Sequence, residues 1–351
     1  MLKADVEVER RDFTVRAAIE VAAGERLALF GPSGAGKTTL LETIAGLVQP
    51  KAGTVEVAGR TLTQTSKPRI AVPPWQRGVG LLRQDPGLFP HLTVRDNLGY
   101  AKTADSGRGE LTSVADALGI GELLSAMPAR LSGGQQHRAA LARLLLARCD
   151  ALLLDEPYSG LDAALRRTLT ALVVRLVTER SVPAVLVAHE LADAQSFASR
   201  IAVIDRGAVL QVGDPDQVVL RPASMRVAEL VGYLGFAEVP DAAAGMDVVG
   251  QPDVAGGRGV AAGIHPDRVV AGAVPDRGLV LTGIVVAARP AGAGWEADLQ
   301  LRESVVTCRL AERPGPTGSQ MVVTALDPPL FGPDGAAINP VVAGVRRGAG
   351  R

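Results

Sequence analysis

Three short stretches of this chain carry residue types that could bind phosphate and activate a water molecule. The first reads GPSGAGKTT at 31–39 and follows an apolar run at 27–30 that is typical of a strand. Glycines at such a strand-to-helix turn let backbone N–H groups converge on phosphate oxygens, and the helix end that follows adds positive potential. Lys37 would reach the β- and γ-phosphates, and the Thr38 hydroxyl would bind Mg²⁺. The pattern predicts a site for ATP or GTP made by Gly31, Pro32, Ser33, Gly34, Ala35, Gly36, Lys37, Thr38 and Thr39.

The second stretch is an apolar run that ends in two carboxylates, ALLLDEP at 151–157. In open α/β sheets, ligands bind beyond the carboxyl ends of the parallel strands, where this pair would lie. Asp155 would then hold Mg²⁺, and Glu156 would act as the general base that polarises an attacking water. The alternative is that the pair only caps the next helix, because SGLD follows at 159–162. The glycine loop upstream favours the catalytic interpretation.

The third stretch, LSGGQ at 131–135, resembles half of a second phosphate site. Ser132, Gly133 and Gly134 precede a predicted helix at 135–148, so a hydroxyl and exposed N–H groups would face an anion. The stretch has no lysine and no metal-binding hydroxyl, and it could therefore bind a phosphate only as a supplement to another site. The alternative is an ordinary serine N-cap.

Hydrophobic patterning indicates the elements that must position these groups. Up to about residue 232, strand-like and helix-like segments alternate, which predicts an α/β unit with a mostly parallel sheet. Residues 236–262 are rich in Gly, Pro and Ala and read as a linker. From residue 278 onward, short alternating runs predict a small all-β barrel within 263–340, and 341–351 reads as a flexible tail.

Composition excludes several classes of protein. The 37 Lys and Arg balance 37 Asp and Glu over 351 residues, so no strong positive field favours nucleic acid or anionic lipid. Cys149 and Cys308 lie far apart in sequence, which favours a reduced, cytosolic chain over a disulfide scaffold. The charged start MLKADVEVERRD is unlike a secretory signal, and no apolar run approaches the ~18 residues that span a bilayer. If the chain acts at a membrane, we expect it to do so from the outside, through other subunits.

Together with the glycine loop, five further motifs resemble, in their order along the chain, those of the ATP-binding subunits of ABC transporters. The glycine loop is followed by Gln84 in LLRQDPGLFPHLTV, which is similar to the Q-loop, and by the signature LSGGQ. The acidic pair comes next, then Asp162 in SGLD, similar to the D-loop, and His189 in VLVAHELADAQ, similar to the switch histidine. The resemblance covers residues 1–235 and implies an ABC cassette of the P-loop NTPase class, with a helical subdomain at about 92–148, that hydrolyses ATP with Mg²⁺.

The resemblance also assigns roles that no single residue would suggest. Two cassettes stack head to tail, so the signature residues would act on the nucleotide of a second copy, and Asp162 would lie at the dimer contact. Gln84 as an isolated residue would be a surface side chain, and a lone histidine is usually structural. The implied catalytic residues are Glu156, His189 and Gln84; the implied Mg²⁺ ligands are Thr38, Gln84 and Asp155; the implied signature residues are Leu131, Ser132, Gly133, Gly134 and Gln135.

The adenine contact departs from the family pattern, which usually places an aromatic side chain ahead of the first glycine. Phe13 is the only aromatic residue in VERRDFTVRAA, and its alternating neighbours are equally typical of a core strand. Arg10 or Arg11 could cover the base instead by stacking. We include Phe13 among the nucleotide-binding residues on this basis.

The C-terminal strands resemble the TOBE domain of importer ATPases over about 260–338. GIHPDRVVA, with His265, Pro266 and Asp267, is similar to its start, and TALDPPLFGPDGAAI is similar to its end. A generic β-barrel is the alternative. The short N-terminal hairpin, the stretch GVGLLRQDPGLFPHLTVRDNLGYA and a single barrel resemble the molybdate branch, so we expect an importer motor for molybdate. Iron, sulfate or thiosulfate, sugar and polyamine importers are the alternatives.

An importer motor implies three kinds of partner: a second copy of the chain, two transmembrane permease subunits, and a periplasmic or lipoprotein solute-binding protein. We expect no nucleic-acid partner. The chain would lie peripherally at the cytoplasmic face of the inner membrane. A soluble ABC ATPase of DNA repair or translation is disfavoured by the neutral charge and the single cassette. A kinase would lack the signature helix and the downstream histidine, and an oxyanion storage protein would need only the barrel.

Overall fold

The computed structural model describes residues 1–11, 13–100, 108–158, 160–238, 260–274, 278–301 and 304–338. The chain divides into two compact units, Met1–Pro215 and Asp216–Arg351, and each is described by itself. The expected linker at 236–262 lies mostly outside the described residues, and the expected tail at 341–351 lies wholly outside them. The domain boundaries drawn from the sequence therefore stay predictions.

The first unit is built on an eleven-stranded sheet in the order β6-β5-β4-β1-β2-β11-β10-β3-β9-β8-β7. Strands β10, β3, β9, β8 and β7 pair in parallel, whereas β6, β5, β4, β1 and β2 form an antiparallel half. The strands are β1 (Leu2–Glu9), β2 (Thr14–Val21), β3 (Arg26–Phe30), β4 (Ala52–Val57), β5 (Arg60–Gln64), β6 (Ile70–Ala71), β7 (Val79–Leu82), β8 (Ala151–Asp155), β9 (Ala184–Ala188), β10 (Arg200–Asp205) and β11 (Ala208–Gly213).

The two halves of the sheet differ in a way that their sequences explain. Strands β8 and β9 are buried at every position, as expected for central parallel strands covered on both faces. Strands β1 and β2 alternate buried and exposed residues, which is typical of antiparallel strands with one wet face. The predicted parallel core is thus confirmed, and the antiparallel half is a feature that the alternation of strands and helices did not indicate.

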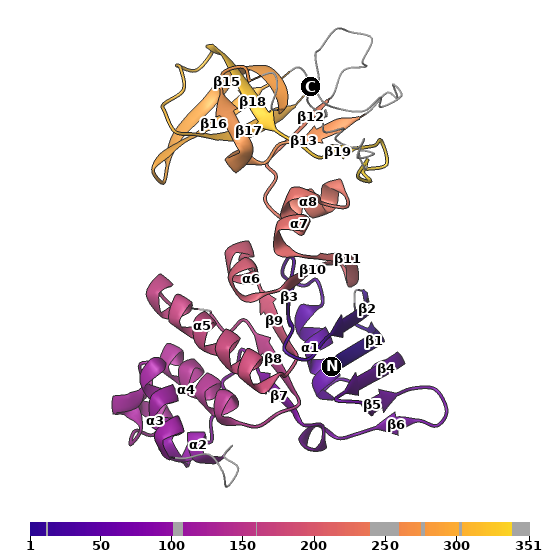
Figure 1. The fold of residues 1–351 in the computed structure, drawn as a ribbon, viewed down its shortest axis with the longest axis vertical. Helices are drawn as coiled ribbons and strands as arrows, with labels where there is room; N and C mark the ends of the chain where they lie inside the picture. The colour runs from indigo at the N-terminus through magenta and orange to yellow at the C-terminus, as the bar shows by residue number, and fades with distance from the viewer. Residues whose placement is uncertain are drawn as a thin grey trace, which may run out of the picture. The chain divides into compact units, whose positions relative to one another are not determined.

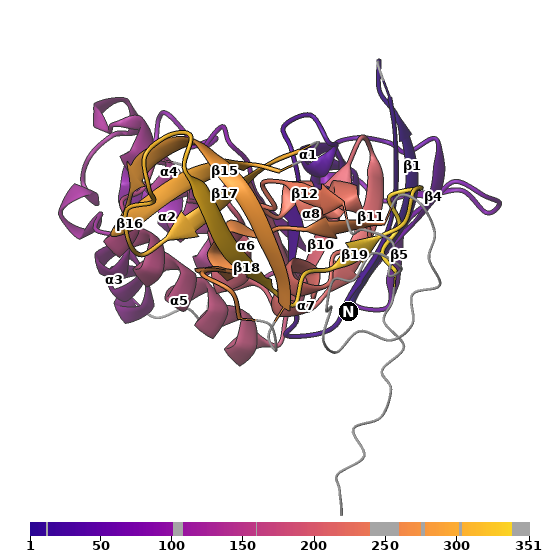
Figure 2. The same cartoon turned by 90° about the horizontal axis from the view of Figure 1, so that it is seen from above.

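Some helices pack against the parallel half of the sheet, and three others lie together at one side of the unit. Figures 1 and 2 both show α2, α3 and α4 together, on the opposite side of the unit from β1 and β4. Helix α1 contacts β7, β8 and β9. The helices are α1 (Lys37–Ala45), α2 (Val94–Tyr100), α3 (Arg108–Ala117), α4 (Gly133–Leu146), α5 (Ala163–Arg180) and α6 (Leu191–Phe197), with 3₁₀ turns at Pro74–Gln76, Gly121–Leu123 and Pro128–Arg130.

The second unit is mainly β, as predicted. A five-stranded sheet runs β14-β18-β15-β16-β17, and its outer strands β14 and β17 contact each other, so the sheet curls. A three-stranded sheet runs β12-β13-β19. The elements are α7 (Pro215–Leu220), α8 (Met225–Leu230), β12 (Phe236–Glu238), β13 (Ala261–Gly263), a 3₁₀ turn at Pro266–Arg268, β14 (Val269–Ala271), β15 (Gly278–Ala291), β16 (Gly294–Gln300), β17 (Val305–Leu310), β18 (Gln320–Leu326) and β19 (Leu330–Phe331).

The two units have separate hydrophobic cores. The alternating strands of the second unit bury Val285, Leu299, Val306 and Val323 on one face. Within the described part of the chain, no helix combines the length and apolar character that crossing a membrane requires.

Candidate functional site

The glycine loop forms a tight bridge between β3 and α1. Gly31 has φ +154°, and a Cβ there would lie 1.9 Å from the Ile204 carbonyl oxygen on β10. Gly36 has φ +101°, and a Cβ there would lie 2.6 Å from Cγ2 of Val15 on β2. Only glycine fits both the backbone angle and the space at these two positions, so the loop packs closely on the sheet while α1 begins at Lys37.

Lys37 is almost completely buried within this loop, with 5% of its surface exposed. Its Nζ donates to the carbonyl oxygens of Gly31 and Pro32, each at 2.8 Å. Burial lowers the pKa of Lys37, and the nearby carboxylates of Glu156 and Asp155 oppose that shift. An ammonium group has three donors, so one N–H and the positive charge remain for a phosphate oxygen.

Thr38 and Asp155 present a pair of hard oxygen donors beside the lysine. The Thr38 hydroxyl donates to Asp155 Oδ1 at 3.2 Å, and Asp155 ends β8 with 3% exposure. Burial raises the pKa of Asp155, the bond from Thr38 lowers it, and neighbouring Glu156 raises it. A hydroxyl and a carboxylate are the ligand types that Mg²⁺ takes in nucleotide sites, where it also keeps water and phosphate oxygens. These two residues therefore fit the metal.

Three polar side chains follow three neighbouring parallel strands at the same edge of the sheet. Gln84 follows β7, Glu156 follows β8 and His189 follows β9. Nε2 of His189 is hydrogen-bonded to Oε1 of Glu156. Glu156 has φ +53°, a left-handed conformation that costs a non-glycine residue on the order of 1–3 kcal/mol, and such strained residues cluster at functional sites.

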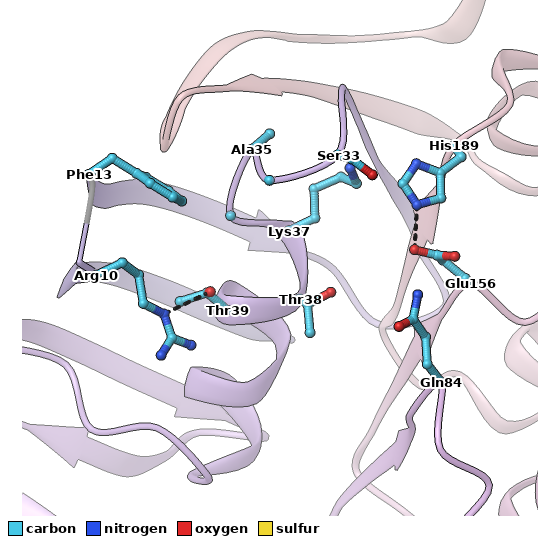
Figure 3. A pocket seen from close by; sticks show the side chains of 12 residues that line it. Arg10, Phe13, Ser33, Ala35, Lys37, Thr38, Thr39, Gln84, Glu156 and His189 are labelled. Atoms are coloured by element: carbon cyan, nitrogen blue, oxygen red, sulfur yellow. Dashed lines mark hydrogen bonds and ion pairs between the residues drawn. The ribbon is translucent and has the colours of Figure 1, made fainter.

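These groups line one pocket of about 370 Å³, a size typical of small-molecule sites. Figure 3 shows Gln84, Glu156 and His189 at one side, and Phe13 and Arg10 at the other, with the glycine loop between them. The lining residues are Arg10, Phe13, Ser33, Gly34, Ala35, Gly36, Lys37, Thr38, Thr39, Gln84, Glu156 and His189. Gly31 and Pro32 lie behind the pocket as acceptors for the lysine.

The two candidates for the base contact both lie at the pocket. Phe13 lines it and also packs against the core cluster, so the two interpretations of this residue are compatible. Arg10 lines it as well: its Nε donates to the Thr39 hydroxyl at 3.0 Å, and its Nη2 lies 3.6 Å from a carboxylate oxygen of Glu42. Arg11 is exposed and is not among the lining residues.

The signature residues and Asp162 lie outside this pocket. Ser132 is the N-cap of α4: its Oγ accepts from Gln135 N at 3.3 Å, and Gln135 Oε1 accepts from Ser132 N at 2.8 Å. Leu131 is buried, Ser132 and Gly133 are exposed, and Gly134 is half-buried. A Cβ on Gly133 or Gly134 would meet nothing within 4 Å among the described residues. The helix begins two positions before the predicted start and ends at Leu146.

Sequence reasoning missed one group of charged residues next to the site. Arg166 on α5 contacts Glu190, the residue after His189, and Asp193, three residues further along the chain. No motif marks these contacts. The available signals were two carboxylates spaced i and i+3 after the histidine and an arginine one turn after Asp162.

The chain is similar to ATP-binding subunits of bacterial importers, and the family model described as ABC transporter matches residues 16–159. The Fe(3+) ions import ATP-binding protein FbpC of Mesorhizobium japonicum is 39% identical over 249 residues, which cover 68% of each chain. The Molybdenum import ATP-binding protein ModC of the same organism is 40% identical over 67% of this chain and 63% of its own. The Sulfate/thiosulfate import ATP-binding protein CysA of Mycobacterium tuberculosis is 44% identical over 60% of each chain. The alignments thus leave about a third or more of each relative unmatched.

Solved structures show the same fold as the first part of the chain. A dimeric bacterial ABC transporter cassette has a TM-score of 0.53 at 25% identity, with 61% of this chain and 99% of that chain covered. An ATP-binding subunit of an ABC transporter has a TM-score of 0.56 at 24% identity, with 66% and 99% covered. The predicted cassette fold is confirmed.

Proposed function

The chain belongs to the ABC transporter family of ATP-binding import subunits, and we propose that it hydrolyses ATP to drive the uptake of a solute. One observation carries this proposal. One pocket brings together Lys37, Glu156 and His189 from three separate stretches of sequence. The lysine can bind phosphate, and the glutamate can serve as general base while it is hydrogen-bonded to the histidine.

Each side chain has a defined task in the proposed reaction. Backbone N–H groups of the glycine loop and the charge of Lys37 hold the phosphates. Thr38 and Asp155, with Gln84, would hold Mg²⁺, which neutralises phosphate charge when it is bound. Glu156 accepts the proton of the attacking water, and His189 keeps that carboxylate turned into the pocket.

The exposed signature favours a second copy of the chain as the partner that completes the site. The first N–H groups of any helix lack intrahelical acceptors, and the first two of α4 belong to Gly133 and Gly134, where a Cβ would meet no neighbour within 4 Å among the described residues. A phosphate held by another protomer could approach them closely. We infer a head-to-tail pair in which Leu131–Gln135 of one protomer complete the pocket of the other, with Asp162 at the contact.

Molybdate is the solute we propose. The Q-loop stretch and the C-terminal strands that resemble a TOBE domain support it, and the molybdenum importer ModC is among the relatives. Sulfate and iron are the competing cargoes, because CysA and FbpC show comparable identity. The motor would act with two permease subunits and a solute-binding protein, as a peripheral protein on the cytoplasmic face of the membrane.

Two measurements test this proposal. The purified full chain should release phosphate from ATP in the presence of Mg²⁺, and a chain that binds ATP without turnover under any condition, permease included, would contradict the motor assignment. A deletion strain should lose uptake of labelled molybdate and keep uptake of sulfate and Fe³⁺. Loss of sulfate or iron uptake alone would overturn the choice of cargo and leave the motor assignment intact.

A further inference from the structure

A cluster of three charged side chains joins the segment after His189 to α5; we call Arg166, Glu190 and Asp193 the Arg166 cluster. Nη1 of Arg166 donates to Glu190 Oε2 at 2.7 Å and to Asp193 Oδ1 at 3.1 Å. Glu190 directly follows His189 and is the N-cap residue of α6, and Asp193 lies in the first turn of that helix. One guanidinium therefore holds two points of the chain that continues from the histidine.

The cluster is more than an exposed ion pair. The Asp193 side chain is 12% exposed and the Arg166 side chain 28%, whereas that of Glu190 is 62% exposed. Burial raises the pKa of Asp193, and Arg166 opposes this shift through its charge and its hydrogen bond. Partly buried charges are screened less by solvent than surface charges, so the contact with Asp193 is the less screened of the two, whereas the contact with Glu190 is the shorter.

Arg166 is itself mounted on a well-capped helix end. Asp162 Oδ1 accepts from the backbone N–H groups of Ala164 and Leu165, each at 2.9 Å. The backbone N–H of Arg166 donates to the carbonyl oxygen of Asp162 at 2.9 Å. The arginine thus belongs to the first turn of α5, and the capping bonds of Asp162 hold that turn in place. Arg166 can therefore hold a neighbouring loop in a defined position.

The loop that it supports is short. Strand β9 ends at Ala188 and α6 begins at Leu191, so only His189 and Glu190 connect them. The histidine ring reaches Glu156 across the ends of β8 and β9. Because Glu190 is the next residue along the chain, a shift of α6 relative to α5 would move the imidazole away from that carboxylate.

We propose that Arg166 is a positioning residue for hydrolysis: by holding Glu190 and Asp193 against α5, it keeps His189 in contact with Glu156. This inference rests on the proposed ATPase function. Arg166 is not among the residues that line the pocket, so its influence on turnover runs through the histidine segment rather than through nucleotide contacts.

The test is a double-mutant cycle on the purified full chain. Arg166→Met should lower kcat for ATP about tenfold while KM changes by less than about twofold, because the phosphate loop is untouched. In a His189→Ala background, Arg166→Met should lower kcat by less than about twofold more, since both changes remove one interaction. Arg166→Lys should give an intermediate kcat, because an ammonium group can replace only part of the contacts that the guanidinium makes with two carboxylates. Arg167→Met, an exposed neighbour on α5, is the matched control and should keep the kcat of the unmodified chain.

Two results would overturn the inference. One is a kcat for Arg166→Met within twofold of the unmodified chain; the other is an equal loss in both backgrounds, which would indicate a general structural role. If Arg166→Met does not fold, the isosteric pair Glu190→Gln and Asp193→Asn removes the same ionic contacts from the other side, with the same expected and contrary outcomes. An unmodified chain without ATPase activity would instead refute the proposed function.

Discussion

Replacing Lys37 with methionine should separate nucleotide binding from stability. The unbranched methionine side chain is one atom shorter than that of lysine and fills most of the same buried space, but it lacks the charge and the donors. A charge-assisted hydrogen bond to phosphate contributes about 1.5–3 kcal/mol, which corresponds to a roughly 10- to 150-fold loss of affinity. We expect this loss for a non-hydrolysable ATP analogue with Mg²⁺, measured by titration calorimetry.

The stability of the same variant without nucleotide should change little. Burial is the largest influence on the pKa of Lys37 and lowers it, so the fold disfavours the charged form. Relief of that cost offsets the loss of the bonds to the Gly31 and Pro32 carbonyls, about 1 kcal/mol each. We expect the free energy of unfolding in urea to stay within about 1 kcal/mol of the unmodified chain. Lys51→Met, an exposed lysine paired with Glu9, is the control for both assays. Unchanged analogue affinity in Lys37→Met would show that Lys37 does not bind the nucleotide phosphates.

Three further predictions address the base, the buried histidine and the glycine loop. Glu156→Gln should bind ATP, lose ~10²–10⁴-fold in phosphate release and accumulate an ATP-dependent dimer on size-exclusion chromatography; full turnover would exclude Glu156 as the base. His137 is buried on α4 and burial lowers its pKa, so the unfolded chain takes up the proton first and stability falls as pH drops below about 6.5. Urea titrations of His137→Gln should lack this component, and identical pH slopes for the two chains would contradict it. Gly31→Ala should lower the free energy of unfolding by on the order of 3 kcal/mol, because its Cβ would lie 1.9 Å from a backbone oxygen, and Gly34→Ala, with no neighbour within 4 Å, should lose less; equal losses would argue against the steric reason.

The parts of the fold that sequence predicts best are those whose signal is local. The apolar run before Asp155 indicates a buried strand by its composition alone, and the glycine loop has a fixed relation to the strand and helix beside it. The antiparallel half could not be derived in the same way, because alternation shows that a strand has one exposed face without showing which strand it pairs with. The short parallel pairing of β2 with β11, at Arg16 and Ala208, joins segments far apart in the chain.

The same contrast applies to the site. Gln84, Glu156 and His189 were predicted from motifs, and the structure brings their side chains to one pocket with the glycine loop. The hydrogen bond between Arg10 and Thr39 joins residues 29 positions apart, and that between Arg166 and Asp193 joins residues 27 positions apart. Such contacts depend on which helices and strands become neighbours, which residue spacing within one element does not specify.

A mixture of two inactive variants, Lys37→Ala and Ser132→Arg, tests most directly whether Lys37 and Ser132 meet across a dimer. If the signature of one protomer completes the pocket of the other, each mixed dimer contains one intact site with Lys37 from one chain and Ser132 from its partner. Random pairing of equal amounts then predicts phosphate release at about a quarter of the unmodified rate, from two preparations that are inactive alone. A mixture as inactive as its components would show that the two residues do not form a shared site across a dimer.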